Sequence, residues 1–352
     1  MSSVQVIEAS GPPTAIGETI GRALAVILLE AITRHRQELA RHRISWDLTH
    51  DLARRLRDDL ERNLPKTAEE LAARARATGV DVDTLISLNA LQETLFLARR
   101  ICMDEGCTSL AVPAEASTDG SVLLAHNEDA LPCRHEQVYV LRVQPADEPS
   151  FRAFAYSGLF FSQGVNEVEI GSAGNALPVT DIRIGVPKLF LYREVLRAST
   201  LAGAIQATLL PERANGNNHL IATAAGEISE IEVTWRHDAL HYGGNGLFSH
   251  ANYVLAPERH SLEEGDILDS QLRRNRGQRL LTLAAGQHTV ETLQALLRDH
   301  ANQPNALCKH LDPAAHHASR TIAGLVIDVT KRELWAAPGA PCRVGFEGMT
   351  LA

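Results

Sequence analysis

The sequence predicts an α+β fold in a single domain, and two patterns carry this prediction. Over residues 16–100, apolar residues recur mostly at helical spacing, whereas from Cys107 onward short apolar or alternating runs bounded by turn residues predict strands. The rest of the chain mixes both patterns, and no internal repeat or low-complexity linker divides it. We therefore expect residues 1–352 to form one α+β unit with a sizeable core.

The first part of the chain is predicted to be mainly helical. Four apolar residues recur on one helix face, namely Leu24, Ile27, Leu28 and Ile32. A further helix is expected to start within 81–85, with Asp83 as its cap, and to continue through leucines spaced along 85–95.

The second part is predicted to begin with a hairpin. Residues 107–113 form a short apolar run, Asp119-Gly120 is a strong turn signal, and 122–126 return as the second strand. Further strands are expected at 138–143, 153–156, 219–224, 228–235, 321–329 and 333–337. Further helices are expected at 189–209, 270–283 and 289–299.

Charge and composition exclude some classes of partner. The net charge is −9, and there is no long basic run, so we do not expect nucleic acid as a partner. The longest apolar run, 23–29, is too short to span a membrane, and the first residues lack a basic segment followed by an apolar one. The chain has five cysteines and no CxxC pair, which favours free thiols and a cytoplasmic location.

The dipeptide Gly106-Cys107 lies where the helical part ends and the first predicted strand begins. A free cysteine thiol is mostly protonated near neutral pH and needs a base to act as a nucleophile. The α-amine of an N-terminal cysteine, with a pKa of about 7.7–8.0, can be that base. It exists only if the bond before Cys107 is broken, and Gly106 would give the thiol access to its carbonyl. From these residues alone, a buried cysteine that simply packs at a strand start is the commoner alternative.

Seven short segments, in order along residues 17–337, carry a resemblance to one known family. They are 17–21, 88–93, 104–109, 124–129, 164–166 with 175–177, 248–252 and 318–320. Together they resemble the acyl-coenzyme A:6-aminopenicillanic acid acyltransferase family, the C45 peptidases, with its DGCT junction, GxNxD strand and HTNH segment. The resemblance implies an Ntn-hydrolase fold, a four-layer αββα sandwich. It also implies self-cleavage between Gly106 and Cys107 into a small, mainly helical subunit, 1–106, and a nucleophile-bearing subunit, 107–352.

The resemblance further implies roles for individual residues. Cys107 would be the catalytic nucleophile, Asp129 the catalytic aspartate and Asn252 the oxyanion-hole donor. The substrate-binding residues would be Ser319, Arg320, Asn166 and Asn175. Each has a structural alternative: Asp129 can cap a turn, Asn252 can adopt a left-handed loop conformation, Arg320 can form a surface ion pair, and the hairpin asparagines can serve their turns.

The function expected from these residues is that of a cysteine amide hydrolase or acyltransferase. Cys107 would take the acyl group of a small N-acylated amine or amino-acid derivative as a thioester, and Arg320 would hold a substrate carboxylate. One alternative is an acyl transferase that uses a coenzyme A thioester as donor at the same site. A second is an uncleaved, non-catalytic binding relative, which the inserted Glu105 favours. No other cofactor is expected, the two fragments should stay associated, and a homo-oligomer is compatible with the sequence.

Two clusters of residues are expected to have no role at the site. His310, His316 and His317 lie close to Cys308, but their spacing matches neither HExxH nor a zinc finger, so we expect no metal site. The basic segment 273–276 is expected to be a solvated helix face.

Overall fold

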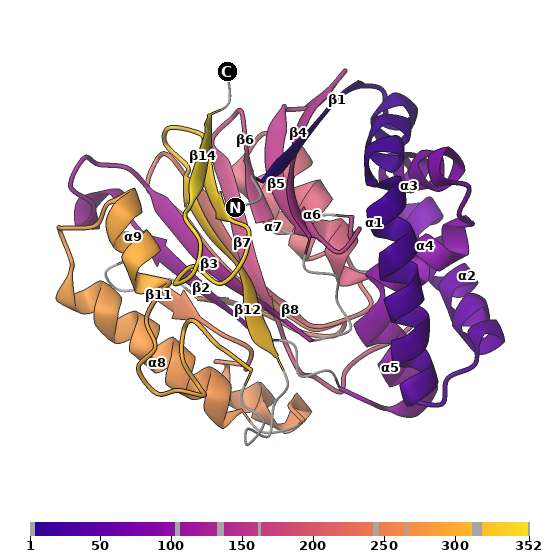
Figure 1. Ribbon diagram of the computed structural model, residues 1–352. Coiled ribbons are helices and arrows are strands. Elements are labelled where there is room, and N and C mark those ends of the chain that lie inside the picture. The colour runs from indigo at the N-terminus through magenta and orange to yellow at the C-terminus, as the bar shows by residue number, and fades with distance from the viewer. Residues whose placement is uncertain are drawn as a thin grey trace.

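The computed structural model describes residues 4–102, 106–131, 137–160, 163–241, 246–264, 267–311 and 319–350. Two β-sheets lie face to face, with one layer of helices outside each sheet (Figure 1). The predicted α+β class and the four-layer αββα arrangement are therefore confirmed.

The N-terminal part forms most of one outer layer. Its helices are α1 (Pro13–Arg41), α2 (Trp46–Asn63), α3 (Pro65–Thr78), α4 (Val82–Asn89) and α5 (Leu91–Arg99). Prolines stand in the first turns of α1 and α3. Proline lacks a backbone N–H, but an N–H at these positions would have no acceptor within the helix. The start of α4 differs from the prediction. Asp81, not Asp83, is its N-cap and accepts a hydrogen bond from the Thr84 backbone at 2.9 Å.

Helices α1 and α3 pack closely because α1 carries glycines on the contact face. A side-chain Cβ at Gly17 would lie 2.1 Å from the Glu70 carbonyl oxygen, and one at Gly21 would lie 2.7 Å from that of Arg74. The segment 17–21, singled out in the sequence, is therefore a helix-packing site.

The first sheet has eight strands in the order β1-β4-β5-β6-β7-β8-β9-β10. Their bounds are β1 (Gln5–Gly11), β4 (Val138–Pro145), β5 (Phe151–Tyr156), β6 (Gln163–Asn166), β7 (Ile170–Ala176), β8 (Asn217–Thr223), β9 (Ile228–Val233) and β10 (Asp238–His241). Strand β1, which the sequence did not predict, pairs parallel with β4 and brings the start of the chain into this sheet. The other neighbours pair antiparallel.

The second sheet has six strands in the order β11-β2-β3-β12-β13-β14. Their bounds are β2 (Gly106–Val112), β3 (Leu123–Ala130), β11 (Phe248–His250), β12 (Arg320–Asp328), β13 (Glu333–Ala337) and β14 (Glu347–Thr350). The predicted hairpin is β2–β3, and Gly120 lies in its connection with φ of +77°, a conformation that favours glycine.

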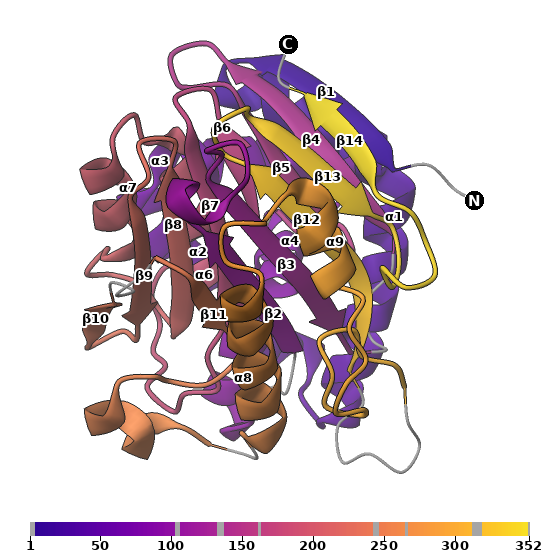
Figure 2. The ribbon, with the colours of Figure 1, turned by 90° about the vertical axis from the view of Figure 1, so that its left-hand side faces the viewer.

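The remaining helices complete the outer layers. The predicted helix 189–209 is two helices, α6 (Lys188–Arg197) and α7 (Leu201–Thr208), because Thr200 caps a new helix start. Both lie on the first sheet, whereas α8 (Leu268–Leu283) and α9 (Val290–Leu296) cover the second (Figure 2). Two short 3-10 helices, Ala114–Ala116 and Pro257–Leu262, lie in connections.

A large buried core fills the space between the layers. It joins residues of α1 and α4, such as Leu28 and Ile86, to residues of the first sheet, such as Val140 and Phe154, and to Leu325 of the second sheet. Within the described residues, no helix is long and apolar enough to span a membrane.

Candidate active site

Cys107 is the second residue of β2 and is buried. The antiparallel pairing of β2 with β3 places Gly106 opposite Asp129 and Cys107 opposite Glu128. On its other side β2 pairs with β11, and Asn252 follows β11 by two residues. Sheet pairing therefore brings Asp129 and Asn252 close to Cys107, although Asn252 lies 145 positions further along the chain.

The Cys107 thiol lies between the two sheets and receives two amide hydrogen bonds. Asn175 Nδ2, from β7 of the facing sheet, lies 3.1 Å from Sγ, and Asn252 Nδ2 lies 3.2 Å from it. Burial, followed by the charge of Glu128, raises the thiol pKa to about 12, although both asparagine hydrogen bonds oppose this shift. The thiol is thus protonated at neutral pH while Cys107 remains within the chain.

The backbone of Cys107 is also held by side chains. Its N–H donates to Asn252 Oδ1 at 2.7 Å, and its carbonyl oxygen accepts from Arg273 Nη1 at 2.6 Å. Arg273 Nη2 donates to the same Asn252 Oδ1 at 3.0 Å. Asn252 is therefore fixed at both ends of its amide, with Nδ2 also donating to the Ala176 carbonyl at 2.9 Å.

The position of Arg273 corrects the expectation of a solvated helix face over 273–276. Arg273 is fully buried on α8, where its Nε donates to Asp269 Oδ2 at 2.9 Å. The buried residues of α8 include Asp269, Arg273, Gly277 and Leu281. This four-residue spacing was the sequence signal for a buried face, but the run of basic residues around Arg273 obscured it.

Asp129 is fully buried and lies beside Gly106. Its Oδ1 accepts from the Thr321 hydroxyl at 2.6 Å, while Oδ2 has no hydrogen-bond partner among the residues that the structure describes. A Cβ at Gly106 would lie 3.0 Å from Asp129 Oδ2, so glycine permits this close approach. Burial raises the pKa of the Asp129 carboxyl, and the positive charges of Lys309 and Arg273 oppose that shift.

Lys309 extends this polar network and was not singled out in the sequence. Its buried ammonium donates to Asp269 Oδ2 and to Ser319 Oγ, each at 3.1 Å. Its backbone N–H donates to Thr321 Oγ1, the hydroxyl that binds Asp129. Ser319, expected to bind substrate, is thus buried next to Lys309.

A pocket opens beside Cys107 between α5, α6 and the two sheets. Its polar lining carries both signs of charge, with the Lys188 ammonium and the carboxyl groups of Glu93 and Glu128. Glu128 accepts from Tyr156 at 2.9 Å, and Lys188 donates to Gln92. The lining also includes Gly106, Cys107, Tyr156, Leu159, Gly174, Tyr192 and Asn217.

Among the described residues that line this pocket, none is one of the four predicted substrate-binding residues, Asn166, Asn175, Ser319 and Arg320. Asn166 uses its amide in the β6–β7 turn, where it donates to the carbonyls of Leu196 and Ala198 and accepts from the Ile170 N–H. Ile170 is four strand residues from Gly174, or about 13 Å. Arg320 begins β12 and is not among the described residues that line the pocket; partial burial, followed by the charge of Arg34, lowers the pKa of its guanidinium.

Parts of the expected junction lie outside the described residues. These are residues 103–105, which contain Glu105. Cys133, His316 and His317 also lie outside the described residues. Cys102, Cys107, Cys308 and Cys342 are free thiols.

Comparisons with solved structures find matches at low sequence identity. No curated sequence matches the chain. A mutant form of conjugated bile acid hydrolase from Clostridium perfringens is 11% identical over 70% of this chain and 92% of its own, with a TM-score of 0.45. Penicillin V acylase from Agrobacterium tumefaciens is 10% identical over 70% of this chain and 86% of its own, with a TM-score of 0.47.

The comparison with protein families gives a match over more than half of the chain. The family described as acyl-coenzyme A:6-aminopenicillanic acid acyl-transferase matches residues 116–343. The match begins after Cys107, so the assignment of the nucleophile depends on the geometry around that residue. With this extent of match, and the αββα layers that the resemblance implied, the chain belongs to the acyl-coenzyme A:6-aminopenicillanic acid acyl-transferase family.

Proposed function

We propose that the protein is a self-cleaving cysteine amide hydrolase or acyltransferase with Cys107 as its nucleophile. The observation that carries this proposal is that Asn175 and Asn252 both donate amide hydrogen bonds to Cys107 Sγ, while Asn252 also holds the Cys107 N–H. This arrangement provides one nucleophile, two donors for a developing oxyanion and a fixed nitrogen.

Self-cleavage would begin with addition of the Cys107 thiol to the Gly106 carbonyl. The C–N bond between Gly106 and Cys107 then breaks as the nitrogen takes up the thiol proton, which leaves Gly106 as a thioester on Sγ. Water hydrolyses the thioester, giving a Gly106 carboxylate, a free thiol and a new amine on Cys107. Asp129 Oδ2 lies beside Gly106 and has no hydrogen-bond partner in the described part of the chain, which supports this step, because the resulting ammonium would supply a donor next to it.

Cleavage would also activate the thiol for turnover. In the intact chain the Cys107 pKa of about 12 leaves almost no thiolate at neutral pH. The new amine is within the same residue and has an ordinary pKa near 8, so it can take the thiol proton. Arg273 would keep the Cys107 backbone in place during both reactions through the carbonyl oxygen.

In turnover, the thiol would add to a substrate amide carbonyl, and Asn175 and Asn252 would stabilise the oxyanion. The tetrahedral intermediate then collapses. The substrate's amine leaves with the proton that the Cys107 α-amine had taken from the thiol, and an acyl thioester remains on Sγ. Water completes hydrolysis, whereas a second amine or thiol completes acyl transfer. A coenzyme A thioester could load the same thiol in a transferase, the activity that the family description names.

The pocket supports a small polar substrate. Lys188, Glu93 and Glu128 place both signs of charge beside Cys107, which favours an N-acylated amine or amino-acid derivative over an apolar amide. Lys188 lines this pocket, whereas Arg320 is not among the described residues that line it. Lys188 would therefore bind a substrate carboxylate in place of Arg320. The free thiols of the described residues support a reducing compartment such as the cytoplasm.

Intact-mass measurement of the purified protein tests the nucleophile. Wild type should give fragments 1–106 and 107–352 in place of the 38.3 kDa chain, and Cys107→Ala should remain intact. Cys107→Ser should cleave more slowly, because a hydroxyl is the poorer nucleophile. Cys102→Ser, the matched control, should cleave like wild type.

An intact wild-type chain after long incubation at neutral pH would favour the uncleaved binding relative instead. A thiol-reactive amide analogue provides a second readout on cleaved protein and should label Cys107. Labelling mainly on another cysteine would show that the nucleophile is misassigned.

A further inference from the structure

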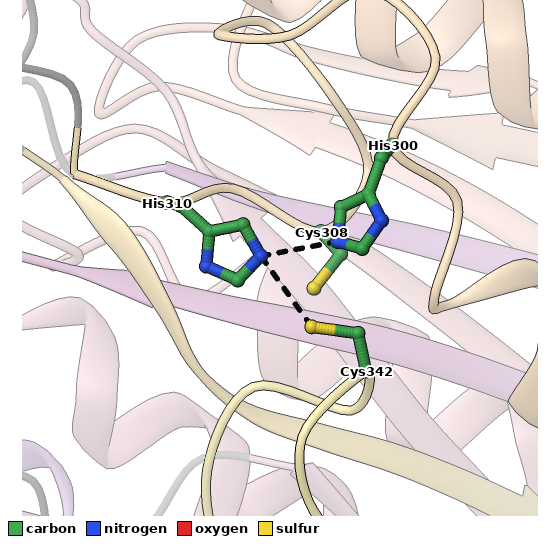
Figure 3. Close-up of side chains that lie close together, drawn as sticks. All are labelled: His300, Cys308, His310 and Cys342. Carbon is green, nitrogen blue, oxygen red and sulfur yellow. Dashed lines mark hydrogen bonds between the residues drawn. The ribbon is translucent and has the colours of Figure 1, made fainter.

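Two imidazoles and two thiols converge beside the second sheet, and none of the four residues lines the Cys107 pocket (Figure 3). The residues are His300, which follows α9, Cys308 and His310 in the segment before β12, and Cys342 in the β13–β14 connection. Their four donor atoms all lie within 4.8 Å of one another. The fold assembles this cluster from two separate connections, α9–β12 and β13–β14, so the spacing along the chain gives no recognisable motif.

The contacts within the cluster converge on one atom. His310 Nε2 lies 3.0 Å from His300 Nε2 and 3.4 Å from Cys342 Sγ (Figure 3). A ring nitrogen of a neutral histidine offers either one proton or one lone pair, so it cannot make good hydrogen bonds to both neighbours at once. A cation among the four atoms would instead accept a lone pair from each.

We propose that His300, Cys308, His310 and Cys342 bind a zinc ion. Two cysteines and two histidines are a donor set of structural zinc sites, with Zn–N of about 2.0–2.1 Å and Zn–S of about 2.3 Å. In a tetrahedron these bond lengths separate the donor atoms by about 3.3–3.8 Å. The observed separations of 3.0 and 3.4 Å, and the limit of 4.8 Å for the others, need only small side-chain adjustments. The expectation of no metal site considered only Cys308 and the histidines near it.

The backbone around the cluster is held in place by other contacts. Cys308 N–H donates to the Asp299 carbonyl at 3.0 Å, and Gln303 Nε2 donates to the Cys308 carbonyl at 2.8 Å. Arg298 Nε donates to the Pro341 carbonyl at 2.9 Å, which joins the end of α9 to the segment carrying Cys342. The two stretches of backbone that carry the four ligands are therefore held close together before a metal binds, and exposed His300 provides a route of entry.

The proposed zinc has a structural role and takes no direct part in the reaction at Cys107. Four protein ligands leave no open coordination position for a substrate. Lys309 lies between two of the ligands in the chain, and its ammonium contacts Asp269, the partner of Arg273. Zinc would thus fasten the segment 300–310 to the β13–β14 connection and hold Lys309 against the polar network behind Cys107.

The test measures metal content and cobalt spectra of the full-length protein purified under reducing conditions. Wild type should contain about one zinc per chain. After chelation and reloading with Co²⁺, it should show a thiolate-to-cobalt charge-transfer band and the d–d bands of tetrahedral cobalt. Cys342→Ser and His310→Gln should lose the bound zinc, and Cys342→Ser should weaken the charge-transfer band.

Two further sets of variants keep the proposal falsifiable. His300→Gln changes an exposed side chain, so it should fold while binding zinc at least tenfold more weakly. Cys102→Ser and His42→Gln, outside the cluster, should keep the full zinc content. Wild type without zinc and without a thiolate-to-cobalt band would overturn the proposal, as would a Cys308–Cys342 disulfide whose reduction restores no cobalt binding. Equal loss of zinc in the controls would also overturn it.

Discussion

Asn252 is the residue on which most contacts of the site meet. Its Nδ2 donates to Cys107 Sγ, and its Oδ1 accepts from the Cys107 N–H and from Arg273. The two ends of the Asn252 amide therefore have different partners: Nδ2 donates to the Cys107 thiol, and Oδ1 holds the Cys107 backbone nitrogen. Arg273 fixes the amide orientation, because a guanidinium can donate only to the oxygen.

We expect Asn252→Ala to lower kcat by much more than it raises KM in protein that has already cleaved. An oxyanion donor acts where charge develops, so its loss should raise the barrier by about 3 kcal/mol. Steady-state kinetics with a chromogenic amide would measure this effect, and Asn63→Ala at the end of α2 is the matched control. Unchanged kcat with a raised KM would instead make Asn252 a substrate contact.

At the scale of single elements, β8 carries a buried histidine close to the pocket. His219 packs against Tyr192 and lies 3.2 Å from Asn217 Nδ2, so a neutral ring can accept this hydrogen bond. Burial lowers the His219 pKa to about 3, with the charges of Arg213 and Lys188 adding to the shift. Strand β8 thus holds an imidazole that is neutral in the folded protein at neutral pH.

This histidine should make the fold sensitive to mild acid. Its pKa falls from an ordinary value of about 6.5 to about 3 on folding, so the unfolded chain binds the extra proton first. Stability should therefore be lost as the pH drops below about 6.5, amounting to about 2 kcal/mol at pH 5 from this group.

Denaturant unfolding at pH 7 and pH 5 would measure this loss. His219→Gln keeps an acceptor for Asn217 and does not titrate, so the variant should lose about 2 kcal/mol less than wild type over this range. An equal loss in both proteins would show that other groups cause the acid sensitivity.

At the scale of the whole molecule, the two halves of the chain share one core. Strand β1 pairs with β4, and α1 packs on the same sheet, so residues before Cys107 complete the sheet formed by residues after it. Gln92 and Glu93 of α5 also line the pocket beside Cys107. The first segment is therefore part of the same fold, and its strand β1 lies before the residues 16–100 whose spacing predicted helices.

If cleavage occurs, fragments 1–106 and 107–352 should remain together in native solution. Separation would expose the apolar face of α1, including Leu24 and Leu28, and remove an edge strand from the first sheet. Native size-exclusion chromatography should give one peak containing both fragments, and denaturant should separate them. Two native peaks, with the second fragment still folded, would contradict a shared core.

Local patterns in the sequence were enough for the fold class and part of the site. Helical spacing indicated the N-terminal helices, and Asp119-Gly120 marked the β2–β3 hairpin, because both signals depend on residues near each other in the chain. The resemblance singled out Cys107, Asn175 and Asn252, and the structure brings all three together.

Tertiary structure decided the contacts that no local pattern records. Arg273 looked like a solvated residue and is buried against Cys107, whereas Arg320 looked like a substrate ligand and lies outside the pocket lining among the described residues. The cluster of His300, Cys308, His310 and Cys342 likewise exists only where the α9–β12 and β13–β14 connections meet. A sequence pattern reports which face of an element is buried, but which faces meet depends on strand pairing and layer packing between distant residues.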